Sequence, residues 1–95
     1  MLKIYLVRTL SGSYLTNPTP HRHFEGPNVR EFKDMKSFLR DYEKRYGDRR
    51  SVIEISGRMP GKDVGEIVEV LRRSGIGIED ILQNGRSLLD KVSVN

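Results

Sequence analysis

The chain opens with an alternating pattern in which Leu2, Ile4 and Leu6 occupy every second position. A period of two predicts a β-strand with one buried face. Ser11-Gly12 supplies a turn, and residues 14–16 (Tyr-Leu-Thr) are predicted to return as a short second strand. Residues 17–28 hold three of the four prolines and both histidines, so we expect an irregular loop there.

Two later segments have the three- and four-residue spacing of amphipathic helices. The first is predicted to begin at Asn28, which has capping-box spacing to Glu31, and to end at Gly47. Its apolar face is predicted to comprise Phe32, Met35, Phe38, Leu39, Tyr42 and Tyr46. The second follows a turn at 57–61 and ends near Gly75, with an apolar face of Val64, Ile67, Val68 and Leu71.

Residues 51–56 (Ser-Val-Ile-Glu-Ile-Ser) predict a β-branched strand between the two helices, which is central if both Val52/Ile53 and Ile55 are covered. The handedness of strand–helix–strand crossovers places it beside the first strand, with the first helix packed across both. Ile76 and Ile78 fit the start of a last strand, Asn84-Gly85 predicts a turn, and residues 86–92 fit either a helix or a strand. We therefore expect one α+β domain over 1–95: a small open sheet of three to four strands with two helices on one face, in the order β(β)αβα plus a short C-terminal strand or helix.

Composition narrows the classes of protein that this chain can represent. It has no cysteine, which excludes disulfides and thiolate metal sites. The apolar run at 1–8 is far too short for a signal peptide or a membrane span, and no later run is longer. We therefore expect a cytoplasmic protein with no membrane partner.

Charge is distributed unevenly along the 95 residues, whose net charge is +4. Residues 1–50 contain eleven Lys and Arg but six Asp and Glu, whereas residues 51–95 contain six and seven. A basic first half favours an anionic partner, although solubility alone also accounts for a modest positive charge.

The turn at 56–63 (Ser-Gly-Arg-Met-Pro-Gly-Lys-Asp) leads from a strand into a helix N-terminus, where backbone N–H groups favour an anion. It is not a nucleotide-binding P-loop, because Gly57 and Gly61 enclose three residues rather than four and Asp63 replaces the Ser or Thr that holds magnesium. A weaker anion contact through Arg58 and Lys62 is one interpretation, and an ordinary strand–helix turn is the other.

Other catalytic or metal-binding patterns are weak. His21 and His23 lie on one side of an extended segment, but zinc requires three or four ligands and Glu25 is the one nearby candidate for a third. Ser11 and Ser13 become nucleophiles only beside a base that the sequence does not reveal. We therefore expect no catalytic residues, no metal and no cofactor.

Nucleic acid is the alternative partner that the sequence favours. Five cations gather around the end of the first helix, and Arg22 adds a basic loop beside an aromatic at 21–24. These candidate nucleic-acid or anion contacts are Arg40, Lys44, Arg45, Arg49 and Arg50, together with Arg22, Arg58 and Lys62. No RNA-recognition, KH or zinc-finger pattern accompanies them.

Residues 51–55 (Ser-Val-Ile-Glu-Ile), 64–71 (Val-Gly-Glu-Ile-Val-Glu-Val-Leu) and 74–76 (Ser-Gly-Ile) resemble the soluble C-terminal domain of the ExbD/TolR family of biopolymer-transport proteins. The resemblance covers residues 3–82 and implies a βαβαβ architecture and dimerisation. The family's membrane anchor has no counterpart in these residues, and its Asp after the third strand is replaced by the turn at Gly57, so we carry over topology and not function.

These observations together favour a small non-enzymatic binding or adaptor domain. It would act through a protein partner or as a homodimer joined through open strand edges, as expected for a sheet of three to four strands.

Overall fold

A computed structural model describes residues 2–18, 26–47, 49–75 and 77–89 of the chain. Its elements follow the order β1 (Leu2–Arg8), β2 (Tyr14–Asn17), β3 (Arg30–Phe32), α1 (Met35–Tyr46), β4 (Ser51–Ile55), α2 (Gly61–Arg73), β5 (Ile78–Gln83) and β6 (Arg86–Ser87). The residues left out include 19–25, so the predicted loop at 17–28 lies largely outside the described residues. Ile76 also lies outside them.

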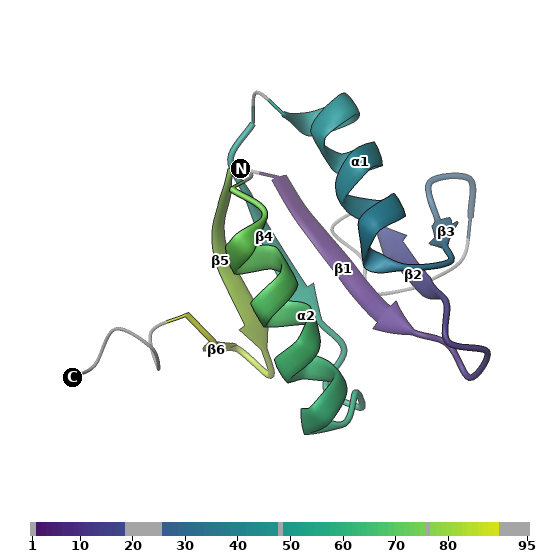
Figure 1. Ribbon diagram of the computed structural model, residues 1–95, viewed down its shortest axis with the longest axis vertical. Helices are drawn as coiled ribbons and strands as arrows, with labels where there is room; N and C mark the ends of the chain where they lie inside the picture. Colours follow the sequence, from purple (N-terminus) through teal and green to yellow (C-terminus); the bar gives the residue numbers. More distant parts are fainter. Residues whose placement is uncertain (1, 19–25, 48, 76, 90–95) are drawn as a thin grey trace.

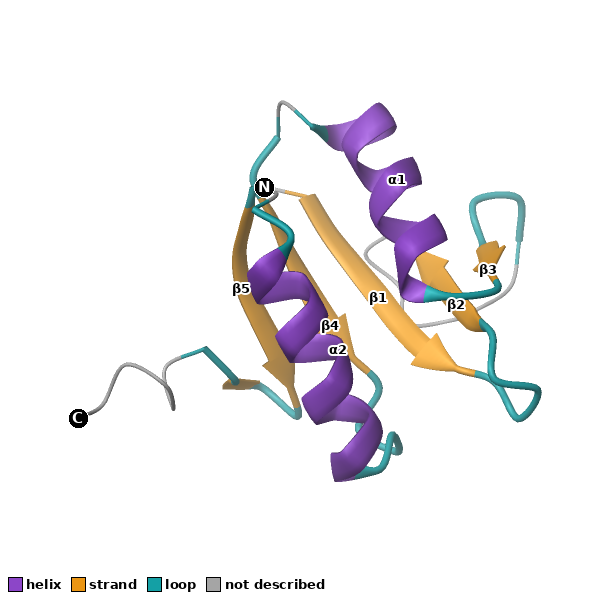
Figure 2. Ribbon diagram, in the orientation of Figure 1, coloured by secondary structure: helices purple, strands orange, loops and turns teal. Residues whose placement is uncertain are grey.

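The strands form one mixed sheet in the order β3-β2-β1-β4-β5-β6. β4 is central and runs parallel to both β1 and β5, and the other pairs are antiparallel. Both helices cover the same face of the sheet (Figures 1 and 2). The predicted α+β class, the helix placement and the β1–β4 neighbourhood are confirmed, whereas three to four strands was too few. The prediction missed β3, whose three residues are too short to show a period of two, and left the segment that contains the two-residue β6 open between helix and strand.

The core lies between this face and the two helices. Ile4 and Leu6 of β1 pair with Ile53 and Ile55 of β4, and all four side chains are buried. The helices add Met35, Phe38 and Tyr42 from α1 and Val64, Ile67 and Leu71 from α2. Each such side chain contributes about 1.5–3 kcal/mol when it leaves water, so the two apolar helix faces hold the fold together.

The opposite face of the sheet is also partly closed. Tyr5 and Glu54 are register partners in β1 and β4, and both are buried. Lys3 Nζ lies 3.3 Å from Glu54 Oε1, and the Tyr5 ring centroid lies 5.8 Å from the same ammonium group. The prediction that β1 buries one face is therefore wrong at its centre, where both faces are covered.

The first helix begins later than the sequence suggested. Asp34 is its N-cap and accepts a hydrogen bond of 2.8 Å from the Ser37 backbone N–H. Hydrogen bonds from Ser37 lower the pKa of Asp34, and the positive charges of Lys33 and Lys36 act in the same direction. The predicted capping box at Asn28 and Glu31 is wrong because Glu31 and Phe32 belong to β3, which pairs with β2. Phe32 still packs against the core, which is why it fits the apolar spacing of the helix that follows it.

The C-terminal half agrees more closely with its sequence pattern. α2 ends at Arg73, and Gly75 follows with a φ of +71°. Asn84 and Gly85 form the predicted turn with φ values of 54° and 77°, a left-handed pair that suits a two-residue hairpin. Residues 86–87 form strand rather than helix, and residues 90–92 of the same segment are not among the described residues.

A buried hydrogen bond between the hydroxyls of Tyr42 and Ser51 joins α1 to β4. We expect Tyr42→Phe to lower the free energy of unfolding by about 1–2 kcal/mol, because the fully buried Ser51 hydroxyl loses its partner. Tyr46→Phe, at a half-buried position of the same helix, should change it far less. Urea denaturation measures both.

Adding Ser51→Ala to Tyr42→Phe should recover part of the loss, since both buried polar groups are then removed. If the double variant loses more free energy of unfolding than the two single variants lose together, this hydrogen bond is not the interaction being measured.

Candidate functional site

β1 and β4 are parallel, so their carboxyl ends lie at the same edge of the sheet (Figure 1). The chain leaves β1 toward β2 and leaves β4 toward α2 and β5, so the two connections diverge from this edge. Such a divergence is where open α/β sheets commonly bind ligands. A crevice of about 480 Å³ lies there, lined by Val7, Arg8, Thr9, Leu10, Gly12, Arg58, Met59, Pro60 and Asp63. We call this region the carboxyl-edge surface.

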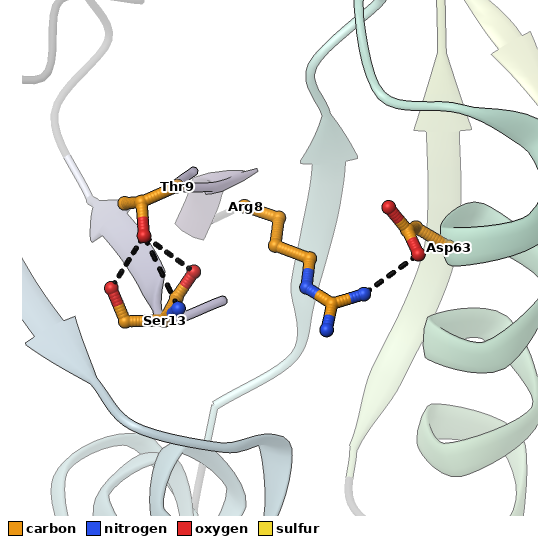
Figure 3. Close-up of polar contacts among 4 residues, drawn as sticks. All are labelled: Arg8, Thr9, Ser13 and Asp63. Atoms are coloured by element: carbon orange, nitrogen blue, oxygen red, sulfur yellow. Dashed lines mark hydrogen bonds and ion pairs between the residues drawn. The ribbon is translucent and has the colours of Figure 1, made fainter. Parts of the chain in front are cut away.

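Arg8 forms the link between the two sides of the carboxyl-edge surface. Its Nη1 lies 2.7 Å from Asp63 Oδ1 in the first turn of α2 (Figure 3). The guanidinium carbon also lies 5.6 Å from the centroid of the Tyr14 ring in β2. Both charged side chains are partly exposed, which limits the stabilisation from the pair. The Asp63 carboxylate also offsets the positive charge of Arg8 at the place where the sequence suggested an anion contact.

The β1–β2 turn is held by hydroxyl groups. Thr9 Oγ1 lies 2.7 Å from Ser13 Oγ and accepts the Ser13 backbone N–H at 3.2 Å (Figure 3). It also lies 2.9 Å from Ser11 Oγ. Ser13 Oγ in turn donates to Glu31 Oε2 of β3 at 2.5 Å. The candidate nucleophiles Ser11 and Ser13 therefore contact one another, Thr9 and a carboxylate. In this turn they act as local cross-links.

The same turn places Leu10 at its tip with a relative exposure of 110%. Among the described residues, Leu10 and Val70 are the two large hydrophobic side chains exposed to solvent. Gly12 permits the tight return with a φ of +91°. The turn therefore holds an apolar side chain in water beside the crevice.

The β4–α2 turn is fixed from the neighbouring strand. Gln83 Nε2 of β5 donates to the carbonyl oxygens of Ser56 and Met59, at 3.1 and 3.4 Å. Gly57 packs against the Asn84 side chain, and a Cβ at residue 57 would collide with the Asn84 side-chain oxygen. Met59 is buried beneath the turn while Arg58 is exposed, so Arg58 projects from an ordered backbone.

The two groups of candidate cations lie at two ends of the central strand. Arg49 and Arg50 follow α1 and precede β4, whereas Arg58 and Lys62 follow it. Five residues of extended strand separate the two groups by about 16 Å. Arg45 lies 2.9 Å from Asp41.

The other candidate cations lie on α1, at the start of β4 or outside the described residues. Arg50 lies 3.7 Å from Glu79 at the same end of the sheet as Arg49. Arg40 and Lys44 lie on the exposed side of α1, and Arg22 is not among the described residues. The helix-end cations and the turn cations, which the sequence suggested as separate anion contacts, therefore stay separate in the fold.

Sequence reasoning also missed Leu10 and the Arg8–Asp63 pair. The signal for Leu10 was present, because a large apolar residue in the polar turn Thr9-Leu10-Ser11-Gly12 has no core to enter. The ion pair spans 55 positions and left no local pattern.

Within the described ranges, no three carboxylate or imidazole groups lie close enough together to hold a metal ion. His21 and His23, the candidate ligands, lie outside those ranges. Neither described helix has the length and apolar character needed to cross a bilayer.

No family model, curated protein or solved structure matches the chain. The resemblance to the ExbD/TolR domain stays a prediction.

Asp63→Asn removes the ion pair with Arg8 and a favourable negative charge at the N-terminus of α2. We expect a loss of about 1 kcal/mol in the free energy of unfolding, because both partners are partly exposed. Raised salt should shrink the difference from the wild type.

Glu66→Gln is the matched control, since Glu66 is exposed on the same helix and has no ion pair among the described residues. Equal losses in the two variants would show that the Arg8–Asp63 contact adds nothing to stability.

Proposed function

We propose that this chain is a non-enzymatic protein-binding domain whose contact site is the carboxyl-edge surface. The observation that carries the proposal is the exposure of Leu10 beside the crevice. A single exposed leucine is common on protein surfaces, but Leu10 borders further apolar lining from Val7, Met59 and Pro60. An exposed apolar side chain at a crevice with further apolar lining is typical of contact with an apolar side chain of a partner.

Charge at the same surface suggests the chemistry of that partner. Arg58 and Lys62 are exposed and form no ion pair within the described part of the chain. Arg8 is paired with Asp63, so Arg58 is the unpaired cation of the crevice lining, and Lys62 adds a second positive charge next to Asp63 in the chain. An acidic segment that carries a large apolar side chain would complement both features.

A different protein suits this surface better than a second copy of the chain. A symmetric dimer through the carboxyl-edge surface would set the excess positive charge of this surface against the same charge on the second copy, and like charges repel. Pairing of strand edges is also disfavoured, because the edge strands β3 and β6 are so short. In β5, next to β6, the Asp80 carboxylate accepts a hydrogen bond of 2.8 Å from the backbone N–H of Ile81. We therefore propose an acidic, apolar peptide segment as the ligand class.

Leu10→Ser tests this assignment on an array of peptides that vary independently in acidic and large apolar residues. The wild type should retain peptides that carry both, and Leu10→Ser should weaken their binding at least tenfold, as for an interface anchor. Its free energy of unfolding should stay within about 0.5 kcal/mol of the wild type, because Leu10 buries nothing in the free chain.

Val70→Ser is the control, since Val70 is the second exposed large hydrophobic residue and lies on α2. Equal weakening by both variants, or retention of no peptide by the wild type, would refute the proposal. Sedimentation should show a monomer. A dimer that Leu10→Ser dissociates would replace the peptide with a second copy of the chain.

A further inference from the structure

The outward side of α1 carries a line of cations. Met35, Phe38 and Tyr42 face the sheet, and Lys36, Arg40 and Lys44 recur at four-residue intervals on the exposed side. Lys33, just before the helix, is exposed as well. A rise of about 1.5 Å per residue gives the stretch from Lys36 to Lys44 a length of about 12 Å. We call Lys33, Lys36, Arg40 and Lys44 the α1 basic face.

These four cations lie outside ion-pair distance of every acid in the described part of the chain, although the Asp34 carboxylate attracts Lys33 and Lys36. None of them forms an ion pair with another described residue. Asp41 is engaged by Arg45, and the Asp34 carboxylate caps the helix through Ser37.

Glu43 is the remaining acid of α1, and it is exposed one residue before Lys44 of the α1 basic face. Because Asp41 is offset by Arg45, the four cations of the α1 basic face outnumber the two other acids near them, Asp34 and Glu43, and the face has a net positive charge.

The second helix shows that this is a property of α1 and not of the helical layer. The outward side of α2 includes the acids Glu66 and Glu69. Glu69 pairs with Arg73 at 2.8 Å and with Arg72 at 4.0 Å. Opposite charges are thus balanced on α2, while α1 presents cations without partners.

The surroundings of the α1 basic face favour one kind of anion. Neither exposed large hydrophobic residue of the described chain lies on α1, and insertion into a membrane surface requires an apolar face. Protein interfaces are depleted in lysine at their centres, whereas lysine and arginine supply most contacts to nucleic-acid phosphates. The aromatic side chains Phe38, Tyr42 and Tyr46 pack in a row against one another and the core, which leaves no aromatic on this face to stack on bases.

We propose that the α1 basic face binds the phosphate backbone of a nucleic acid without reading its bases. The contact predicted from sequence lay at the end of the first helix (residues 40–50) and in the 21–24 loop. The α1 basic face adds Lys33 and Lys36. It leaves out Arg45 and Arg50, which pair with Asp41 and Glu79. Arg49, exposed just past the helix, extends the same positive region. This inference does not depend on the carboxyl-edge surface, which lies on different elements.

Fluorescence anisotropy with a labelled DNA duplex of about 20 base pairs tests the proposal between about 50 and 200 mM salt. Neutralisation of four phosphates predicts that log K falls against log salt with a slope of about −3.6. The triple variant Lys36→Gln, Arg40→Gln and Lys44→Gln should reduce the slope to about −0.9 and weaken binding at least tenfold at the lowest salt. Two duplexes of unrelated sequence should bind equally well.

The matched control removes three positive charges elsewhere by Arg72→Gln, Arg73→Gln and Arg86→Gln. Both triple variants lower the net charge equally, so a specific contact requires that the control keep the wild-type slope. Circular dichroism should show that both remain folded, since glutamine is a good helix former.

Three outcomes would overturn the proposal. They are no salt-dependent binding by the wild type, equal loss in the two triple variants, and equal binding to polyglutamate or to anionic lipid vesicles at matched charge. The last result would identify a general anion surface rather than a nucleic-acid site.

Discussion

The parallel pairing of β1 with β4 is the constraint on which the other features depend. Parallel neighbours cannot be joined by a tight turn, so the chain between them makes a crossover that contains β2, β3 and α1. The same pairing aligns Ile4 with Ile53 and Leu6 with Ile55, which gives both helices one apolar surface to cover. It also brings the ends of both strands to one edge, where the Leu10 turn and the Arg58 turn lie across a common crevice.

Covering one sheet face with two helices also fixes which helix surfaces meet water. Once Phe38 and Tyr42 face the sheet, the helical period directs Lys36, Arg40 and Lys44 outward. The carboxyl-edge surface and the α1 basic face therefore belong to different elements and need not compete for a ligand. We propose on this basis an adaptor that holds an acidic protein segment at the strand ends and a phosphate backbone along α1.

The sequence predicted the fold wherever an element was long enough to repeat its pattern, as in β1, α1, β4 and α2. It failed at β3, whose three residues carry no period, and at the start of α1, where Phe32 continued the helical spacing from within a strand. It left residues 86–92 open between helix and strand, because the two residues of β6 show no period either. The candidate site was less predictable. Arg8 and Asp63 meet through the topology alone, and Arg50 and Arg58 are near in sequence but lie at opposite ends of β4.

Inter-strand nuclear Overhauser effects between β1 and β4 test the central claim most directly. The account predicts contacts between the backbone protons of Ile4 and Ile53 and of Leu6 and Ile55, in an order that rises along both strands. Contacts whose order falls along one strand as it rises along the other would mean antiparallel pairing. That result would separate the Leu10 and Arg58 turns and contradict the proposed crevice.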